Sequence, residues 1–241
     1  MKTRKMASAI AASLAAMALT TAAAEANLVT NGDFSANASS YVTYPGYSPG
    51  GGASGSNPLT PTGWSIAGTP EPVVGVNGPD TGFYASNGEP FAPSSTTGVR
   101  DFAFMQDTSI YTNVSISQLI STVAGQTYTL TYAAAQRSGD SSASMQALVL
   151  DATNSNSTIT TQTPSVSTSN FGDFALTFTA RSTSTMIEFL NNTNNGADNT
   201  VDVSNVVLTA LPQPGTIGLL GVGSLALLGG WALRRRVANK L

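Results

Sequence analysis

The side chains able to carry out chemistry in this sequence are carboxylates, tyrosines and a few arginines. The 241 residues include no histidine and no cysteine, which excludes histidine-based triads, thiol nucleophiles and most transition-metal sites. Twelve of the 13 acidic residues lie between residues 27 and 211. Two carboxylates on facing strands would serve glycoside hydrolysis, but none of the twelve stands in a recognisable catalytic motif. The sequence therefore predicts that the protein is not an enzyme, with a hydrolase as the remaining catalytic alternative.

Two loops with aromatic residues form the first candidate ligand site. Tyr41, Tyr44 and Tyr47 crowd one loop, and Tyr84 stands in another. Sugar rings stack on exposed aromatic faces, while polar side chains bind their hydroxyl groups. Loops that converge at one end of the fold would make these residues a sugar platform. In the alternative interpretation, the same aromatics cap the core beneath long loops.

Gln136 and Arg137 form the second candidate ligand site. Both lie at the end of a predicted strand, after a run of apolar residues. Arg137 would donate paired hydrogen bonds to a sugar hydroxyl or carboxylate. Alternatively, its guanidinium pairs with an internal acid such as Asp101 or Glu188, because a buried guanidinium needs a partner.

Residues 1–26 have the pattern of a secretory signal peptide. A basic start precedes an apolar stretch over residues 6–19 and the small-residue site Ala24-Glu25-Ala26. This pattern predicts Sec export and cleavage by signal peptidase, with Asn27 as the first residue of the mature protein. The alternative is an uncleaved anchor, for which an apolar core of 14 residues is short.

Residues 211–241 have the pattern of a membrane anchor. An apolar run from Thr216 to Leu233 is flanked by prolines before it and arginines after it. As a helix the run is about 27 Å long, close to the hydrocarbon thickness of a bilayer. Basic residues beside a span stay cytoplasmic, so residues 27–210 are expected on the other side of the membrane. The flanking residues are Pro212, Gln213, Pro214, Arg234, Arg235 and Arg236.

Residues 27–210 are enough for one domain. Between residues 27 and 211, three arginines, no lysine and twelve acids give a net charge of −9. Binding to nucleic-acid phosphates needs a basic surface, so a nucleic-acid partner is not expected. The absence of cysteine means that the domain is held together without disulfides.

About ten short strand patterns cover this domain, with no amphipathic helix among them. The most regular patterns span residues 99–106, 114–120, 126–135, 144–151, 157–162, 171–180, 185–191 and 200–210. Val201, Val203 and Val207 are expected to share one face of the last strand. Residues 27–34 are expected to form a short strand closed by the turn pair Asn31-Gly32. Trp64 opens a later strand and is assigned to the core. The predicted fold is all-β, a two-sheet antiparallel β-sandwich, because βαβ units and fixed-period repeats are absent from the pattern.

The C-terminus resembles the PEP-CTERM sorting signal, which has the same order of Pro-x-Pro motif, apolar helix and arginine cluster. Gln213 stands where that family usually has Glu. The resemblance implies export in a Gram-negative bacterium that makes exopolysaccharide. It also implies processing near the motif by an exosortase, a membrane-embedded cysteine protease. The precursor would be tethered to the inner membrane, and the mature domain would be periplasmic, cell-surface or extracellular.

The domain itself resembles the galactose-binding-like jelly rolls, the architecture of many carbohydrate-binding modules. The matching pieces are residues 27–34 (NLVTNGDF), 62–64 (TGW), 103–106 (AFMQ), 124–130 (AGQTYTL), 134–137 (AAQR) and 198–206 (DNTVDVSNV). The resemblance implies a jelly-roll sandwich. Proteins of this fold bind sugars, mediate adhesion or serve structural roles.

A structural Ca²⁺ ion is the metal that this second resemblance implies, and no other cofactor is expected. Many jelly-roll carbohydrate modules hold Ca²⁺ where the first strand meets the last. Asp33 and Asp202 stand in the first and last motifs, and carboxylates are preferred Ca²⁺ ligands. The family often has an acid where this chain has Ser35. In the alternative interpretation, Asp33 is a turn residue and Asp202 a solvated strand residue.

We therefore expect an exported, non-catalytic cell-surface or extracellular-matrix protein that binds or organises exopolysaccharide. The alternative is a structural or adhesive surface protein that acts through protein–protein contacts without binding sugar.

Overall fold

The computed structural model of the chain describes residues 26–36, 60–70, 72–77, 99–137, 142–168, 170–193 and 195–212. Within them, ten strands form two five-stranded antiparallel sheets. The predicted signal peptide and C-terminal segment lie outside the described residues, apart from Ala26, Leu211 and Pro212. In the part of the chain that is described, no helix is long and apolar enough to cross a membrane.

The two sheets are named here after their central strands. The β9 sheet has the order β1-β4-β9-β6-β7, and the β10 sheet has the order β2-β3-β10-β5-β8. The β9 sheet consists of β1 (Ser65–Thr69), β4 (Thr112–Ser121), β9 (Ser184–Asn191), β6 (Met145–Asp151) and β7 (Ser157–Gln162). The β10 sheet consists of β2 (Val74–Asn77), β3 (Phe102–Asp107), β10 (Asn199–Ala210), β5 (Thr127–Gln136) and β8 (Gly172–Thr179).

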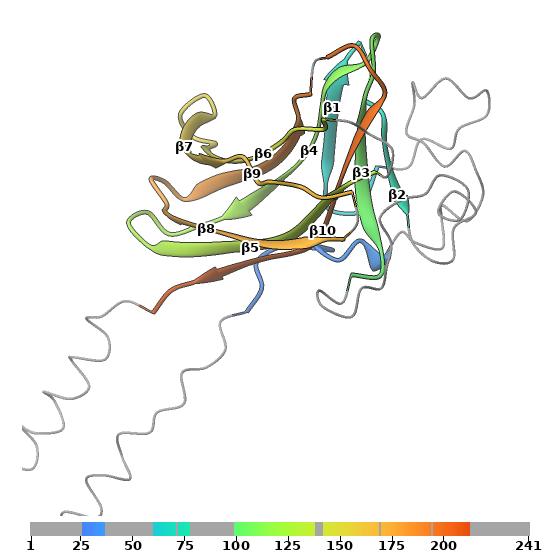
Figure 1. Cartoon of the computed structure of the whole chain (residues 1–241). Coiled ribbons are helices and arrows are strands. Elements are labelled where there is room, and N and C mark those ends of the chain that lie inside the picture. The colour runs from blue at the N-terminus through green and yellow to red at the C-terminus, as the bar shows by residue number, and fades with distance from the viewer. Residues whose placement is uncertain are drawn as a thin grey trace, which may run out of the picture.

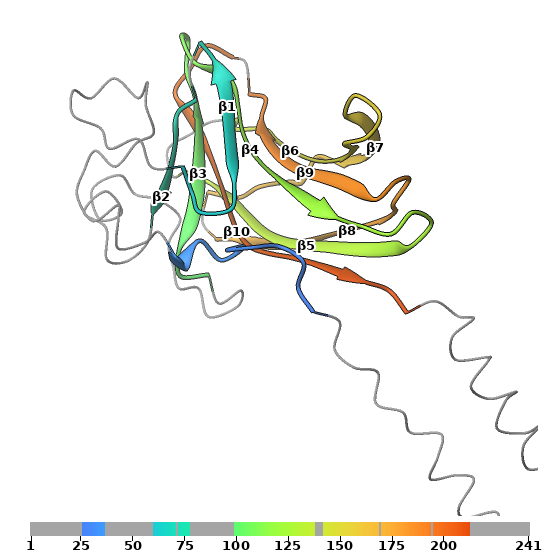
Figure 2. The same ribbon diagram turned by 180° about the vertical axis from the view of Figure 1, so that it is seen from behind.

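Successive strands alternate between the two sheets. From β4 to β6 each strand lies in the sheet opposite its predecessor, and the same holds for β8, β9 and β10. This alternation is the topology of a jelly roll, and Figure 1 and Figure 2 show the arrangement from opposite sides. The predicted two-sheet antiparallel sandwich is confirmed.

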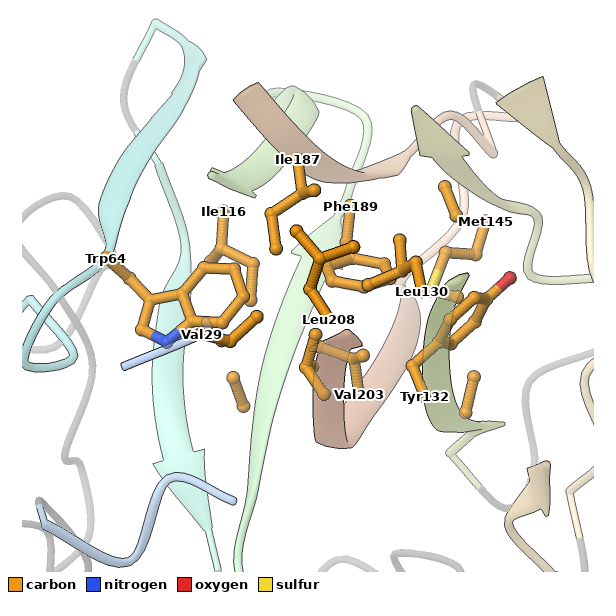
Figure 3. Packing of buried hydrophobic residues seen from close by; sticks show 14 of the residues in the cluster. Val29, Trp64, Ile116, Leu130, Tyr132, Met145, Ile187, Phe189, Val203 and Leu208 are labelled. Carbon is orange, nitrogen blue, oxygen red and sulfur yellow. The ribbon is translucent and has the colours of Figure 1, made fainter. Parts of the chain in front are cut away.

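The core lies between the sheets and is organised around Phe189 of β9. The ring centroid of Phe189 is 6.2 Å from that of Trp64 and 5.0 Å from that of Tyr132. Figure 3 shows Trp64 and Tyr132 on opposite sides of the cluster with Phe189 between them. Trp64 is only 5% exposed, which confirms its assignment to the core.

The first described segment, residues 26–36, differs from the strand expected over residues 27–34. It runs beside the second half of β10 without forming a regular strand. The Leu28 amide donates to Leu208 O at 2.9 Å, and the Val206 amide donates to Gly32 O at 2.9 Å. The segment occupies this edge because β3 pairs with β10 only as far as Val203.

Two further contacts fix this segment. The Thr30 amide donates to Gln118 Oε1 at 2.8 Å, and Gln118 Nε2 donates to Thr30 O at 2.9 Å. Phe34 is fully buried and stacks on Trp64 with ring centroids 5.3 Å apart. The start of the described chain is thereby anchored on both sheets.

A β-bulge divides β10 into two halves. The register with β5 shifts between Ser204 and Val207, and Asn205 has a positive φ of 50°. Val201 and Val203 face the core before the bulge, whereas Val206 and Leu208 face it afterwards. The expectation that Val207 shares a face with Val201 and Val203 is therefore wrong, because the extra residue reverses the alternation.

Candidate functional site

A pocket lies on the β10 sheet where β10, β5 and β8 run side by side. Its volume is about 370 Å³, within the range of about 300 to 1,000 Å³ that is usual for small-ligand sites. The described residues that line it are Thr131, Tyr132, Asp173, Phe174, Ala175 and Asn205. They come from the neighbouring strands β10, β5 and β8, which are labelled in Figure 1.

Strand register brings the lining residues together. Thr131 pairs with Ala175, and Ala133 pairs with Asp173. Tyr132 and Phe174 pack against the core between the sheets, so the alternating Thr131, Asp173 and Ala175 project from the outer face. The bulge in β10 places Asn205 on the other side of β5 from β8.

An aromatic pair supports the pocket from inside. Tyr132 and Phe174 stack with ring centroids 5.6 Å apart and planes at 27°. The Tyr132 hydroxyl donates to Gln162 Oε1 at 2.8 Å, and Gln162 Nε2 donates to Ala175 O at 3.3 Å. Burial raises the pKa of Tyr132 far above its ordinary range, so the hydroxyl keeps its proton and remains a donor. Gln162 of β7 thus ties the β9 sheet to the wall of the pocket.

The outer face of the β10 sheet changes from apolar to hydroxyl-bearing along β5. On one side of the pocket, a small second core is buried on this face and includes Phe102, Phe171, Ala133 and Ala135. On the other side, threonines form cross-strand hydroxyl pairs, with Oγ1 atoms of Thr129 and Thr177 3.4 Å apart and those of Thr127 and Thr179 3.3 Å apart. The pocket therefore lies at the boundary between an apolar patch and an uncharged hydroxyl-bearing surface.

The polar groups at the pocket are a carboxylate, a carboxamide and a hydroxyl. Asp173 accepts hydrogen bonds, Thr131 donates and accepts, and Asn205 does both through its amide. Asp173 is exposed, and it is the one carboxylate among the lining residues that the structure describes. Such a set matches the hydroxyl groups of a sugar, whereas the paired carboxylates of a glycosidase are not found among these described residues.

The described residues that line the pocket include none of those expected from the sequence to bind ligand. Tyr41, Tyr44, Tyr47 and Tyr84 fall outside the described residues. Gln136 is buried at the end of β5, where its backbone amide donates to Ser167 O at 2.9 Å.

Arg137 is held by an acid other than the two considered from the sequence. Its Nη2 lies 2.9 Å from Asp198 Oδ1, with 14% of its side chain exposed. Gln106 Nε2 donates to the same carboxylate oxygen. Asp101 and Glu188 were expected as partners, but the long β9–β10 connection carries Asp198 to the start of β10, beside the end of β5.

The two expected calcium ligands have different surroundings. Asp33 is exposed and accepts hydrogen bonds from the Ser35 amide at 3.2 Å and the Ser35 hydroxyl at 2.9 Å. Asp202 is fully buried and pairs in register with Phe104 and Ala135. Asp202 is thus not the solvated strand residue of the alternative interpretation. Within the described ranges, no cluster of three or more acidic side chains that could hold a metal ion occurs.

Sequence reasoning missed Thr131, Asp173 and Asn205 as site residues. Asp173 could have been recognised from the sequence, because it is the only charged residue in the alternating pattern of β8. Asn205 could also have been recognised, because the apolar positions that face the core in β10 change from odd to even numbers around it. The pocket itself depends on cross-strand register, which neither signal reveals alone.

Comparison with known proteins gives a partial family match and remote structural similarities. A family model described as "Protein of unknown function (DUF642)" matches residues 107–202. A search of curated proteins finds no match.

Three solved structures illustrate the structural similarities. TmCBM61 in complex with β-1,4-galactotriose is 13% identical with a TM-score of 0.44, over 77% of this chain and 99% of that one. The CBM22-1 xylan-binding domain of Xyn10C from Paenibacillus barcinonensis is 9% identical with a TM-score of 0.42, over 64% and 89%. The enzymatically active domain of tailspike protein 4 from bacteriophage CBA120 is 11% identical with a TM-score of 0.49, over 77% and 21%. The sugars named for the first two are ligands of those proteins.

Proposed function

We propose that this chain is an exported, non-catalytic protein whose sandwich binds polysaccharide through the pocket on the β10 sheet. The observation that carries the proposal is the placement of Asp173, Thr131 and Asn205 around one pocket of about 370 Å³. Small-ligand sites combine a shaped pocket with a few convergent polar groups.

The expected ligand class follows from charge and size. A carboxylate that accepts hydrogen bonds from two sugar hydroxyls fixes the orientation of a ring, and such charge-assisted bonds are the stronger ones. The domain carries a net charge of −9 between residues 27 and 211, which favours neutral sugars over uronic acids. A neutral hexose unit of an exopolysaccharide fits these conditions.

The test is a glycan array followed by titration calorimetry with the full chain in detergent and its Asp173→Asn variant. Loss of a hydrogen bond to a charged group costs about 1.5 to 3 kcal/mol, so the variant should bind about 10- to 150-fold more weakly. Thr177→Val is the matched control, because Thr177 lies on the same strand and face, beyond the pocket lining. Equal affinity of the wild type and Asp173→Asn would place any sugar elsewhere, and no binding to any glycan would favour the structural or adhesive alternative.

The cellular setting is part of the same proposal. The signal-peptide pattern of residues 1–26 and the apolar run over residues 216–233 support export with transient tethering to the inner membrane. The Pro-x-Pro and arginine cluster around that run support processing by an exosortase-like enzyme. Mass spectrometry of the mature protein from its host tests this, since intact residues 1–26 or 213–241 would contradict the respective cleavage.

A further inference from the structure

One end of the sandwich, called the turn end here, gathers three short turns between successive strands and both ends of the described chain. The turns are residues 122–126 between β4 and β5, 152–156 between β6 and β7, and 180–183 between β8 and β9. Figure 1 shows these turns on the left, and the end of β10 points toward the same side. Hydrogen bonding of Leu28 to Leu208 places the start of the domain beside its last strand.

Side-chain hydrogen bonds make the turn end a connected surface. Asp151 Oδ1 accepts from the Ser182 hydroxyl at 2.7 Å and from the Thr153 hydroxyl at 2.8 Å. The Thr122 hydroxyl donates to Ser182 O at 3.0 Å. Because these bonds link all three turns, the turn end acts as one rigid platform rather than three independent loops.

The turn end carries most of the exposed large apolar side chains. Among the described residues there are five such side chains, and four of them lie at or next to the turn end. They are Leu28 at 38% exposure, Leu119 at 64%, Val123 at 63% and Leu211 at 41%. The fifth, Ile110 at 66%, lies between β3 and β4 at the opposite end. Among the residues that the structure describes, the large exposed apolar side chains are therefore concentrated at the turn end.

The turns at the turn end carry little charge. Arg181 is the only charged residue in the sequences of the three turns. Asp151, which precedes one of them, is 5% exposed and bound by Ser182 and Thr153. In a domain with a net charge of −9, a surface without exposed carboxylates is suited to approach an anionic bilayer.

The connection to the predicted anchor is short. The Leu211 amide donates to Thr127 O at 2.8 Å, and Gln126 Nε2 donates to Leu211 O. Leu211 is thus held on the sheet, and the apolar run of the sequence begins at Thr216. Five residues span at most about 18 Å, whereas a ten-residue strand such as β5 is about 33 Å long. The tether is shorter than the domain.

We propose that the turn end rests on the membrane surface while the chain is anchored, with Val123 and Leu119 among the lipid headgroups. The apolar run over residues 216–233 serves as the anchor in this proposal. Exposed apolar residues at such a surface enter the headgroup region, and Arg181 contacts lipid phosphates. The pocket faces sideways from the β10 sheet and stays open to solvent, so this contact and sugar binding are independent.

The test uses the full chain reconstituted in vesicles of phosphatidylcholine and phosphatidylglycerol. The chain has no cysteine, so Val123→Cys and Ile110→Cys each provide a single site for a fluorophore. The two positions are matched in exposure, at 63% and 66%, and lie at opposite ends. A nitroxide lipid headgroup, which quenches only at short range, should quench the label at position 123 at least about threefold more than that at position 110.

A second pair of variants controls for folding. Val123→Asp should lower the quenching of a label at Leu119→Cys, because a carboxylate is costly among headgroups. Ile110→Asp, an equivalent change at the far end, should leave it unchanged. Equal quenching at positions 123 and 110, stronger quenching at 110, or failure of the chain to co-float with the vesicles would each overturn the proposal. None of these results depends on whether the protein binds sugar.

Discussion

The closure of the sandwich by its first segment depends on the absence of a side chain at Gly32. A Cβ atom at this position would lie 2.0 Å from the backbone oxygen of Val206, more than about 1 Å inside ordinary contact distance. Val206 belongs to β10 and cannot rotate its carbonyl away. Alanine at position 32 must therefore push residues 26–36 off β10 and weaken the burial of Phe34, which is 0% exposed.

The magnitude for Gly32→Ala has two parts. Overpacking costs about 1 to 3 kcal/mol, and partial loss of a buried Phe adds up to about 1.5 to 3 kcal/mol. We expect a total of about 3 to 5 kcal/mol. Gly125→Ala is the control, because Gly125 has a φ of 81° but no atom within 4 Å of a Cβ there. Its cost is the left-handed strain alone, about 1 to 2 kcal/mol.

Urea unfolding of both variants, followed by tryptophan fluorescence and circular dichroism, measures this difference. Trp64 reports on the segment directly, since it stacks on Phe34. A Gly32→Ala variant no less stable than Gly125→Ala would show that the first segment does not pack against Val206 as described.

Two remaining predictions concern side-chain hydrogen bonds. Ser182 and then Thr153 lower the pKa of Asp151 by donating to its carboxylate. Because the folded pKa lies below the unfolded one, the stabilisation is present above about pH 4 and is lost as pH falls through the folded pKa. Asp151→Asn should therefore flatten the acid limb of a stability-versus-pH curve, and an unchanged limb would contradict this. Gln118→Ala removes both bonds to the Thr30 backbone and should cost about 1 to 3 kcal/mol in denaturant; a change below the fitting error would contradict it.

The strands were largely predictable because each buries one face. In β5 and β8, large apolar residues alternate with threonines, and the structure places these strands within one or two residues of the predicted bounds. The pattern over residues 157–162 coincides with β7. Period-two alternation is a local property, so a single sequence suffices to recognise it.

Features that depend on distant partners were not predictable. Residues 27–34 look like a strand, but the edge they occupy exists only because β3 leaves β10 at Val203. Residues 27–211 offer twelve acids as partners for Arg137, and only the folded chain selects Asp198.

The pocket is the clearest case of this limit. Thr131 and Asn205 are 74 positions apart in the sequence, and a bulge at the second brings it beside the first. Val207 was assigned to the wrong face for the same reason, since the positive φ of Asn205 reverses the phase of the strand.

The most direct test of the central proposal is the mapping of amide chemical shifts in an isotope-labelled protein titrated with a neutral oligosaccharide that the array identifies. We predict that the perturbed amides cluster at Thr131, Asp173, Ala175 and Asn205, and that the Asp173→Asn variant loses these changes at the same sugar concentration. Perturbations confined to the outer face of the β9 sheet, or an unchanged response in Asp173→Asn, would contradict the assignment of this pocket as the sugar-binding site.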